Sequence, residues 1–292
     1  MRTIEVLFVT LLFGLPIFGQ GLLDPVYGTQ RAFEAVVEER GIKPALMEFL
    51  AEDAVIFRPE AVNGREFLKS SDSSVPGTLR RKVNYADVSI NGLLAYTIGE
   101  WTFTPKARPK EIRVGEYATV WSKVDGRYKA ILDIEISHEV FGAIDYSRRI
   151  PEPRKSQPNK QGWSAADATM RFLKMSMSKA GLGGAYDAFA AEDVILLRDG
   201  LPPIVGRGRA EEELERYIAA DFPQKVSQFE TGDMAYSWNA CSYADSNEGM
   251  EKGNCLHVWK FRDKKWYIIL GVFAKIENTT IPILKDRLVP RK

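Results

Sequence analysis

The chain has 292 residues, enough for about one to two domains, and its 45% hydrophobic and 27% charged residues are ordinary for a globular protein. The 40 basic and 39 acidic residues leave a net charge of only +1. This balance excludes a strongly basic chain of the kind that binds nucleic acid or an anionic membrane, so we expect neither partner.

The first segment in chain order is an apolar run, residues 6–18, which follows Arg2. It is shorter than the roughly 20 residues that cross a bilayer, and it is typical of a secretory signal peptide. We therefore expect a signal peptide over residues 1–20 and an exported protein, periplasmic or extracellular, without a membrane span. The alternative is a buried N-terminal helix.

Two helices are predicted next. Phe33, Val36 and Val37 recur at helical spacing, and Gly41 suits the left-handed conformation that often ends a helix. Pro44 then suits the first turn of a second helix.

A sheet is predicted after these helices. The run AVIF, residues 54–57, contains β-branched residues and predicts a strand, and Gly64 opens a short helical or turn segment. Turn signals, including the strong hairpin signal Asp125-Gly126, divide the next part into strands. The predicted strands cover 83–90, 93–104, 114–123 and 127–137.

The sequence contains an internal repeat. FLAEDAVIFRP (49–59) recurs as FAAEDVILLRD (189–199), an offset of 140 (189 minus 49), and NGLLAYT (91–97) matches TGDMAYS (231–237) at the same offset. VWSKVDGRYKAILDI (120–134) matches VWKFRDKKWYIILGV (258–272) at an offset of 138. So long a period indicates a duplicated domain of about 110–120 residues rather than a solenoid. In the second copy, residues 209–222 predict a helix.

The order of elements, the phrase AEDAVIF after a helix, the glycine before a short helix and the hairpin VWSKVDGRYKAILDI resemble the nuclear-transport-factor-2-like superfamily. The SnoaL-like and ketosteroid-isomerase-like group of domains of unknown function is the most similar part of it. The resemblance implies an α+β fold with two tandem cone-shaped domains, each with helices packed on a curved antiparallel sheet. The expected order is a signal peptide (1–20), a first copy (29–140), a linker (141–162), a second copy (163–275) and a C-terminal tail (276–292).

This superfamily includes isomerases, dehydratases, cyclases, dioxygenase subunits and non-catalytic adaptors, so the fold does not select an activity. In the ketosteroid-isomerase branch, the catalytic carboxylate lies just before the proline that follows the repeated phrase. Arg58 and Arg198 stand at that position here, and an arginine stays protonated at neutral pH. The remaining catalytic candidates are Asp133 and His138, neither of which recurs in the second copy.

Alternation along the last strand decides what Asp133 faces. If Tyr128 faces the pocket, Ala130 does too, and Asp133 lies on the other side beside Lys129. The pocket wall would then be apolar and would lack the positioned acid or base of a dehydratase. We expect no cofactor and no metal site, because no set of histidines and carboxylates converges.

Three kinds of side chain are candidates for lining a pocket. The arginines could bind a ligand carboxylate or pair with a nearby acid, the tyrosines could present a hydroxyl or belong to the core, and the tryptophans could stack on a ligand or pack the sheet. These candidates are Arg58, Arg198, Tyr96, Tyr236, Trp101 and Trp121.

Cys241 and Cys255 flank a proposed hairpin centred near Asn247-Glu248. Antiparallel pairing would bring the two cysteines opposite one another, and an exported protein permits a disulfide between them. The alternative is a pair of buried thiols.

Three functions stay open at this point. The chain could bind a small, partly apolar molecule without catalysis, or it could be an isomerase, dehydratase or cyclase with one active domain. The third is a scaffold, either a monomer in which the two copies pair internally through their sheets or a homodimer.

Overall fold

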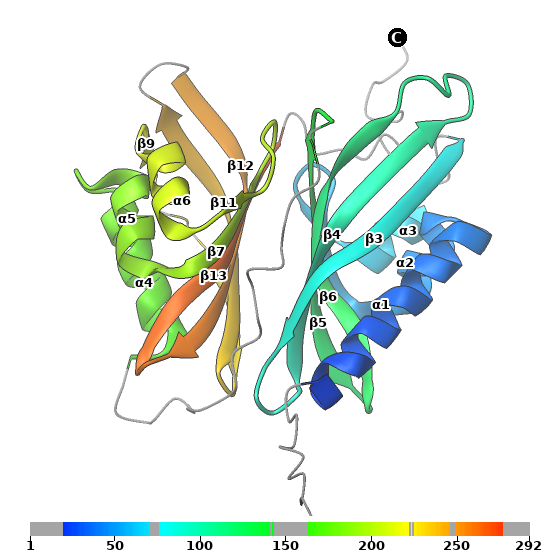
Figure 1. Ribbon diagram of the computed structural model, residues 1–292, viewed down its shortest axis with the longest axis horizontal. Helices are drawn as coiled ribbons and strands as arrows, with labels where there is room; N and C mark the ends of the chain where they lie inside the picture. Colours follow the sequence, from blue (N-terminus) through cyan, green and yellow to red (C-terminus); the bar gives the residue numbers. More distant parts are fainter. Residues whose placement is uncertain are drawn as a thin grey trace, which may run out of the picture.

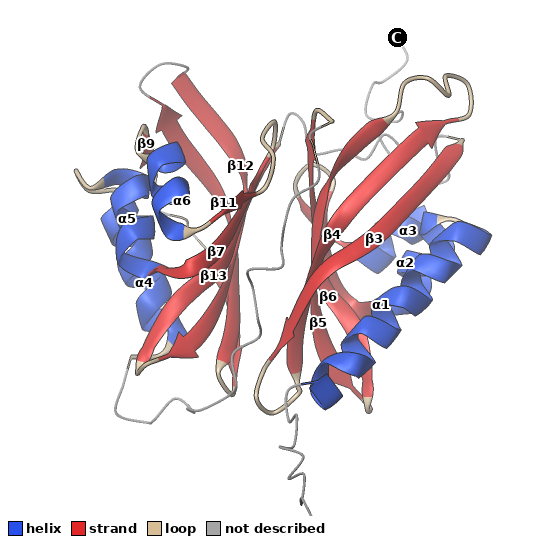
Figure 2. Cartoon of the chain, viewed as in Figure 1, coloured by secondary structure: helices blue, strands red, loops and turns tan. Residues whose placement is uncertain are grey.

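The computed structural model describes residues 20–70, 76–140, 142, 163–221, 223, 225–245 and 249–276. Almost all of the expected signal peptide, linker and tail lies outside these residues. Two curved sheets stand face to face, and each carries its helices on the side away from the other sheet (Figures 1 and 2). Among the described helices, none combines the length and apolar character that crossing a membrane requires.

The first half begins with the two predicted helices, and Gly41 between them has a φ of 88°, as expected for a residue in the left-handed region. Its helices are α1 (Gln20–Arg40), α2 (Ile42–Phe49) and α3 (Gly64–Ser70). Its strands are β1 (Leu50–Phe57), β2 (Ala61–Asn63), β3 (Gly77–Val88), β4 (Leu94–Pro105), β5 (Arg113–Val124) and β6 (Arg127–His138).

The first sheet has the order β2-β1-β6-β5-β4-β3. The four long strands β3 to β6 form the predicted antiparallel meander, and β1 joins β6 in parallel. The hairpin between β5 and β6 turns at Asp125 and Gly126, whose φ angles of 48° and 79° explain the Asp-Gly pair at this point.

The second half repeats this arrangement. Its helices are α4 (Ala165–Ser176), α5 (Gly181–Phe189) and α6 (Arg207–Leu214). Its strands are β7 (Ala190–Arg198), β8 (Ile204–Val205), β9 (Tyr217–Ala219), β10 (Ser227–Thr231), β11 (Met234–Asp245), β12 (Gly249–Arg262) and β13 (Lys265–Lys275). The main path of the second sheet is β10-β11-β12-β13-β7-β8, and β9 pairs with β11.

The predicted helix over residues 209–222 is wrong in its second part. The helix α6 ends at Leu214, and residues 217–219 form strand β9 instead. Tyr217 is buried whereas Ile218 is exposed, which is the alternation of a strand that covers a core on one face. Pairing with β11 therefore overrides the local helix preference.

A polar contact that recurs at equivalent positions shows the duplication in three dimensions. The indole nitrogen of Trp121 donates to Thr97 Oγ1 at 3.0 Å, and that of Trp259 donates to Ser237 Oγ at 3.0 Å. These pairs are equivalent under the sequence offsets of 138 and 140. Each half therefore holds its central tryptophan against its neighbouring strand in the same way.

The two sheets bury an apolar layer between them. It contains Leu94, Ile98, Leu132 and Ile134 of the first half, with matching residues of the second half such as Val258. Equivalent strands meet in this layer, β4 with β11 and β6 with β13. At its edge, Asn91 Nδ2 donates to Thr231 Oγ1 at 2.7 Å, and these two residues are also equivalent. The two halves are thus related by an approximate two-fold axis.

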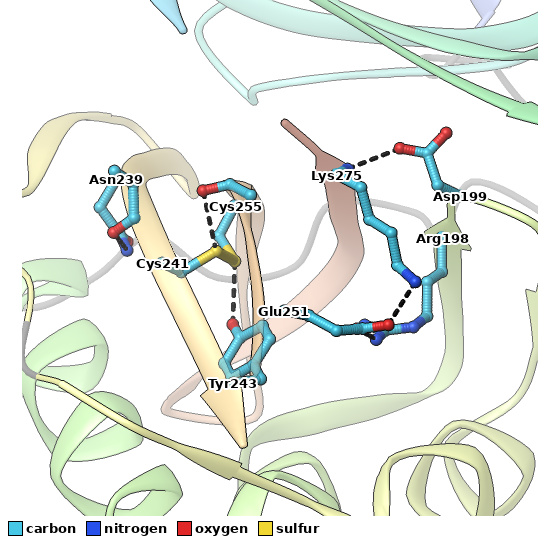
Figure 3. The surroundings of a disulfide bond; sticks show 10 residues. Arg198, Asp199, Asn239, Cys241, Tyr243, Glu251, Cys255 and Lys275 are labelled. Carbon is cyan, nitrogen blue, oxygen red and sulfur yellow. Dashed lines mark hydrogen bonds and ion pairs between the residues drawn. A yellow bond between two sulfur atoms is a disulfide. The ribbon is translucent and has the colours of Figure 1, made fainter. Parts of the chain in front are cut away.

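A disulfide joins Cys241 and Cys255 across β11 and β12 (Figure 3). The register pairs Cys241 with Gly253 and Cys255 with Asn239, so the cysteines lie diagonally and not directly opposite as predicted. Their Cα atoms are 6.1 Å apart, within the ordinary range for a disulfide.

We expect the double variant Cys241→Ser/Cys255→Ser to lose about 3 kcal/mol of unfolding free energy, because the bridge restricts the unfolded chain. Urea unfolding of the variant and of the oxidised wild type measures this loss, and reduced wild type is the control. The intact mass should rise by a pair of hydrogens on reduction; an unchanged mass would mean that the thiols are free.

Candidate functional site

A β-bulge in β6 decides which side chains face the first cone, the space between the first sheet and its helices. The register with β5 shifts after Ala130, so Ile131 has no partner opposite it. Tyr128 and Ala130 face the helices, but beyond the bulge Asp133 and Glu135 do. The expectation that Asp133 lies away from the cone is therefore wrong, because it assumed unbroken alternation.

Four charged side chains meet inside this cone, and we call them the ionic cluster: Arg58, Arg81, Asp133 and Glu135. Arg81 forms a two-pronged pair with Asp133, at 3.1 Å and 2.8 Å, and also bonds to Glu135. Glu135 Oε2 lies 3.7 Å from Arg58 Nη1. Thr119 Oγ1 donates to Asp133 at 2.6 Å. All four charged side chains are buried, and their two positive and two negative charges balance.

Burial and charge pairing compete in this cluster. Burial alone would lower the pKa of Arg81, but the carboxylates of Asp133 and Glu135 more than offset it, so the pKa is raised. The pKa of Glu135 is also raised, because the loss of solvation exceeds the attraction of Arg81 and Arg58. The cluster therefore depends on its internal pairs, since removal of one member leaves a buried charge without compensation.

The space beside the cluster is very small. A cavity of about 10 Å³ lies between the apolar side chains Leu46, Phe49 and Trp121 and the polar groups Arg81 and Asp133. This volume holds about one water molecule, whereas pockets for small organic ligands are about 300–1,000 Å³. Three polar atoms of the cluster have no hydrogen-bond partner among the described residues: Arg58 Nε, Arg81 Nε and Glu135 Oε2.

Aromatic rings pack together in the second cone, the equivalent space of the second half. Gly271 stands in place of Asp133, and a Cβ at Gly271 would overlap the hydroxyl of Tyr186. Phe172 contacts the rings of Tyr186 and His257, with centroids 5.6 Å and 4.7 Å apart. The tyrosine thus occupies the volume that a carboxylate takes in the first cone.

Arg198, the counterpart of Arg58, pairs with Glu251 of β12, which Lys275 also contacts (Figure 3). Its guanidinium lies over the rings of Tyr217 and Phe273 at 4.1 Å and 4.3 Å from their centroids. Each of the two arginines therefore has a carboxylate of its own half as partner. Of the two roles that the sequence left open for these arginines, binding of a ligand carboxylate and pairing with a nearby acid, the structure shows the second.

The predicted aromatic candidates divide between the two faces of the sheets. Tyr96 and Tyr236 pack into the layer between the sheets, so the structure does not bring them to a cone. Trp101 and Trp121 lie in the core of the first cone. Both indole nitrogens are satisfied internally, that of Trp101 by the carbonyl oxygen of Ile136 at 3.0 Å.

Asp133 and His138 lie on opposite faces of β6. His138 lies five positions further along β6, so alternation places it on the opposite face, toward the second sheet. Its Nδ1 contacts the carbonyl oxygen of Glu139 at 2.6 Å. A mechanism that uses both residues on one substrate has no geometric support here.

Sequence reasoning missed Arg81, Glu135 and Thr119. One signal was present: Asp133 and Glu135 are two residues apart and must share a face of β6. Because two acidic side chains on one buried face need compensating charge, positively charged side chains are expected opposite them. The basic partner Arg81 lies on β3, 52 residues earlier, and only the curved sheet brings it to Asp133.

A surface groove of about 280 Å³ lies outside the ionic cluster, between the α1–α2 junction and the start of β3. Its walls include Gly41, Lys43, Thr78 and Phe103. Among the described residues, no three His, Cys, Asp or Glu side chains are grouped so that they could hold a metal ion.

Neither a protein-family model nor a curated protein matches the chain. Solved structures similar to one half of it include an NTF2-like protein of unknown function from Shewanella oneidensis, with 19% identity and a TM-score of 0.32 over 38% of this chain and 96% of that one. A ketosteroid isomerase-like protein from Erwinia carotovora has 15% identity and a TM-score of 0.34 over 40% and 97%. An NTF2-like protein of unknown function from Prochlorococcus marinus has 15% identity and a TM-score of 0.33 over 39% and 94%.

The names of these structures agree with the superfamily that the sequence resembles. Each structure covers less than half of this chain. The predicted fold of two tandem α+β cones is confirmed by the element order and sheet topology of both halves. Identities of 10–19% and TM-scores near 0.3 carry no information about a shared activity.

We expect Arg81→Met to lower the free energy of unfolding by about 3–5 kcal/mol, because Asp133 and Glu135 would stay buried without their cation. Lys82→Met is the matched control, since the Lys82–Glu100 pair is solvent-exposed and should change stability by less than about 1 kcal/mol. Urea unfolding at pH 7 measures both. Equal losses in the two variants would show that the ionic cluster is not a paired unit.

Two buried groups, His257 and Asp199, should change the folding stability in opposite directions as pH falls below 7. Burial lowers the pKa of His257 from 6.5 to about 4, so between these values the unfolded chain binds a proton that the folded chain does not, and stability falls as pH falls. Burial raises the pKa of Asp199 from 3.8 to about 6, against its hydrogen bonds from Ser137 and Lys275. The folded chain therefore gains that proton first, and stability rises as pH falls through this window.

We expect His257→Thr, which copies the residue of the first half, to gain stability relative to wild type between pH 7 and pH 4.5. Asp199→Asn should lose stability relative to wild type over the same interval. Each difference should approach about 1.4 kcal/mol per pH unit in the middle of its window. Urea unfolding at the two pH values measures them, and parallel curves for all three proteins would contradict the assignment.

Proposed function

We propose that this chain is a non-catalytic, exported scaffold protein in which two closed cones pair into one unit that meets its partners through its outer surface. One observation carries the proposal: both cone interiors are occupied by the protein's own side chains. The first contains the balanced ionic cluster and a cavity of about 10 Å³, and the second contains Tyr186 packed on Gly271.

The small size of the cavity in the first cone argues against catalysis there. An acid or base must lie within hydrogen-bond reach of the substrate proton that it moves. Asp133 already accepts bonds from Arg81 and Thr119, and the apolar side chains of α2 close the cavity beside it. Both arginines at the position of the isomerase base are engaged with Glu135 and Glu251.

Two features support export. The apolar run over residues 6–18 is typical of a signal peptide, and the disulfide between Cys241 and Cys255 is typical of proteins in oxidising compartments. Both are consistent with a periplasmic or extracellular location.

A second candidate function is the binding of a small, partly apolar molecule in the first cone. The three polar cluster atoms without hydrogen-bond partners among the described residues favour it, because buried polar groups are usually satisfied. Such binding requires the side chains of Leu46 and Phe49 to move away from Arg81. An isomerase- or lyase-type activity of Asp133 would require the same opening.

We expect the full chain to sediment as a monomer of no more than 32.9 kDa. Its melting temperature should not change with indole, benzoate or 2-naphthoate, because the cavity in the first cone is too small for them. Leu46→Ala is the control that enlarges the first cone and should respond to indole, as enlarged apolar cavities do. A response of the wild type that Arg81→Met abolishes would replace the scaffold proposal with the binding one.

A further inference from the structure

A buried lysine connects the two halves. The ammonium of Lys260, on β12, lies 3.3 Å from Asp87 Oδ2 of the first half and 3.3 Å from Asp233 Oδ2 of its own half. It also donates to the carbonyl oxygen of Val88 at 3.0 Å. The side chains of Lys260, Asp87 and Asp233 are 8%, 6% and 4% exposed, so the charges depend on one another rather than on water.

This contact has no charged counterpart across the approximate two-fold axis. Lys260 lies opposite Met234, and Ser122 lies opposite Leu94 in the equivalent strand pair, so Ser122 corresponds to Lys260. The strand register also identifies the counterpart of Asp87.

Asp87 lies opposite Tyr96, and Phe229 lies opposite Tyr236, the equivalent tyrosine. Phe229 therefore corresponds to Asp87. The symmetry-related contact would join Ser122 and Phe229, and neither carries a charge.

The asymmetry discriminates between ways of pairing the sheets. Two first halves packed in the same geometry would set Asp87 against Ser122 twice, which buries two carboxylates without a cation. Two second halves would set Lys260 against Phe229 twice and leave Asp233 as its single counter-charge. Only a first half packed on a second half satisfies Lys260, Asp87 and Asp233 together.

We propose that the sheet face of each half is a recognition surface whose partner is the unlike half of the same chain, and that Lys260 and Asp87 determine this choice. The inference goes beyond the scaffold function, because it concerns how one chain avoids its own copies. Like-with-like pairing would need at least one further chain to cover each face, and would therefore produce dimers or larger species. Unlike pairing within one chain closes the assembly at once.

Two opposite changes remove the discrimination. Asp87→Asn/Asp233→Asn/Lys260→Ser deletes the charges, so that no pairing buries an unpaired ion. Ser122→Lys/Phe229→Asp adds the missing symmetry mate, so that every pairing contains a Lys–Asp contact. Lys82→Ser/Glu100→Ser deletes an exposed ion pair of the first sheet and is the matched control.

Sedimentation velocity at protein concentrations from about 10 to about 200 µM measures the oligomeric state, which reports how the sheets pair. Far-UV circular dichroism verifies that each variant is folded. We expect wild type and control to stay monomeric, and the two variants to form dimers and larger species with at least roughly ten-fold stronger self-association. If only one variant folds, its sedimentation decides. A folded variant that stays as monomeric as wild type overturns the proposal, whatever the outcome of the ligand tests.

Discussion

The packing of one sheet face on the other is the constraint from which the rest of this structure follows. A curved sheet with helices on one side leaves its other face open, and here that face is apolar: Leu94, Ile98, Leu132 and Ile134 all point away from their own helices. Such a face must be covered, because exposed apolar patches of this kind associate. In this chain a second copy of the same unit supplies the cover (Figure 1). The duplication and the burial of β4 on both faces are therefore two aspects of one requirement.

The pairing also frees the interior of each cone to diverge. Because the layer between the sheets stabilises both halves, neither cone has to keep the same core. The first holds charges, with Asp133 bonded to Arg81 and Thr119, and the second holds rings, with Tyr186 packed on Gly271. The difference between Asp133 in the first half and Gly271 in the second therefore reflects a change in the side chains that form the core. It does not mean that the second half has lost its fold.

Much of the fold could be predicted from the sequence, and the errors have local physical causes. The repeat, the glycine that ends α1 and the Asp-Gly hairpin all follow from short-range rules, and the structure confirms them. The direction of Asp133 could not be predicted, because the bulge at Ile131 has no composition signal and reverses the alternation beyond it. The ionic cluster could not be predicted either, because the bulge changes the direction of Asp133 and Glu135 and because Arg81 lies on a distant strand. The diagonal disulfide differs from the predicted one by two residues of register, which residues 241–255 do not specify by themselves.

A comparison of the surroundings of Arg58 and Arg198 distinguishes a structural role of the repeated arginine from a ligand-binding role. Arg58 and Arg198 occupy the same position at the end of β1 and β7, and both are buried. A ligand anchor would be expected to keep its surroundings, because the ligand fixes them. The surroundings changed instead: the position of Glu135 holds Phe273 in the second half, and the counter-charge comes from Glu251 on a different strand. What persisted is the rule that a buried guanidinium needs a carboxylate, whichever strand provides it. The same rule governs Lys260 at the joint, so the arginines of the cones and the lysine between them are explained by the pairing of buried charge alone.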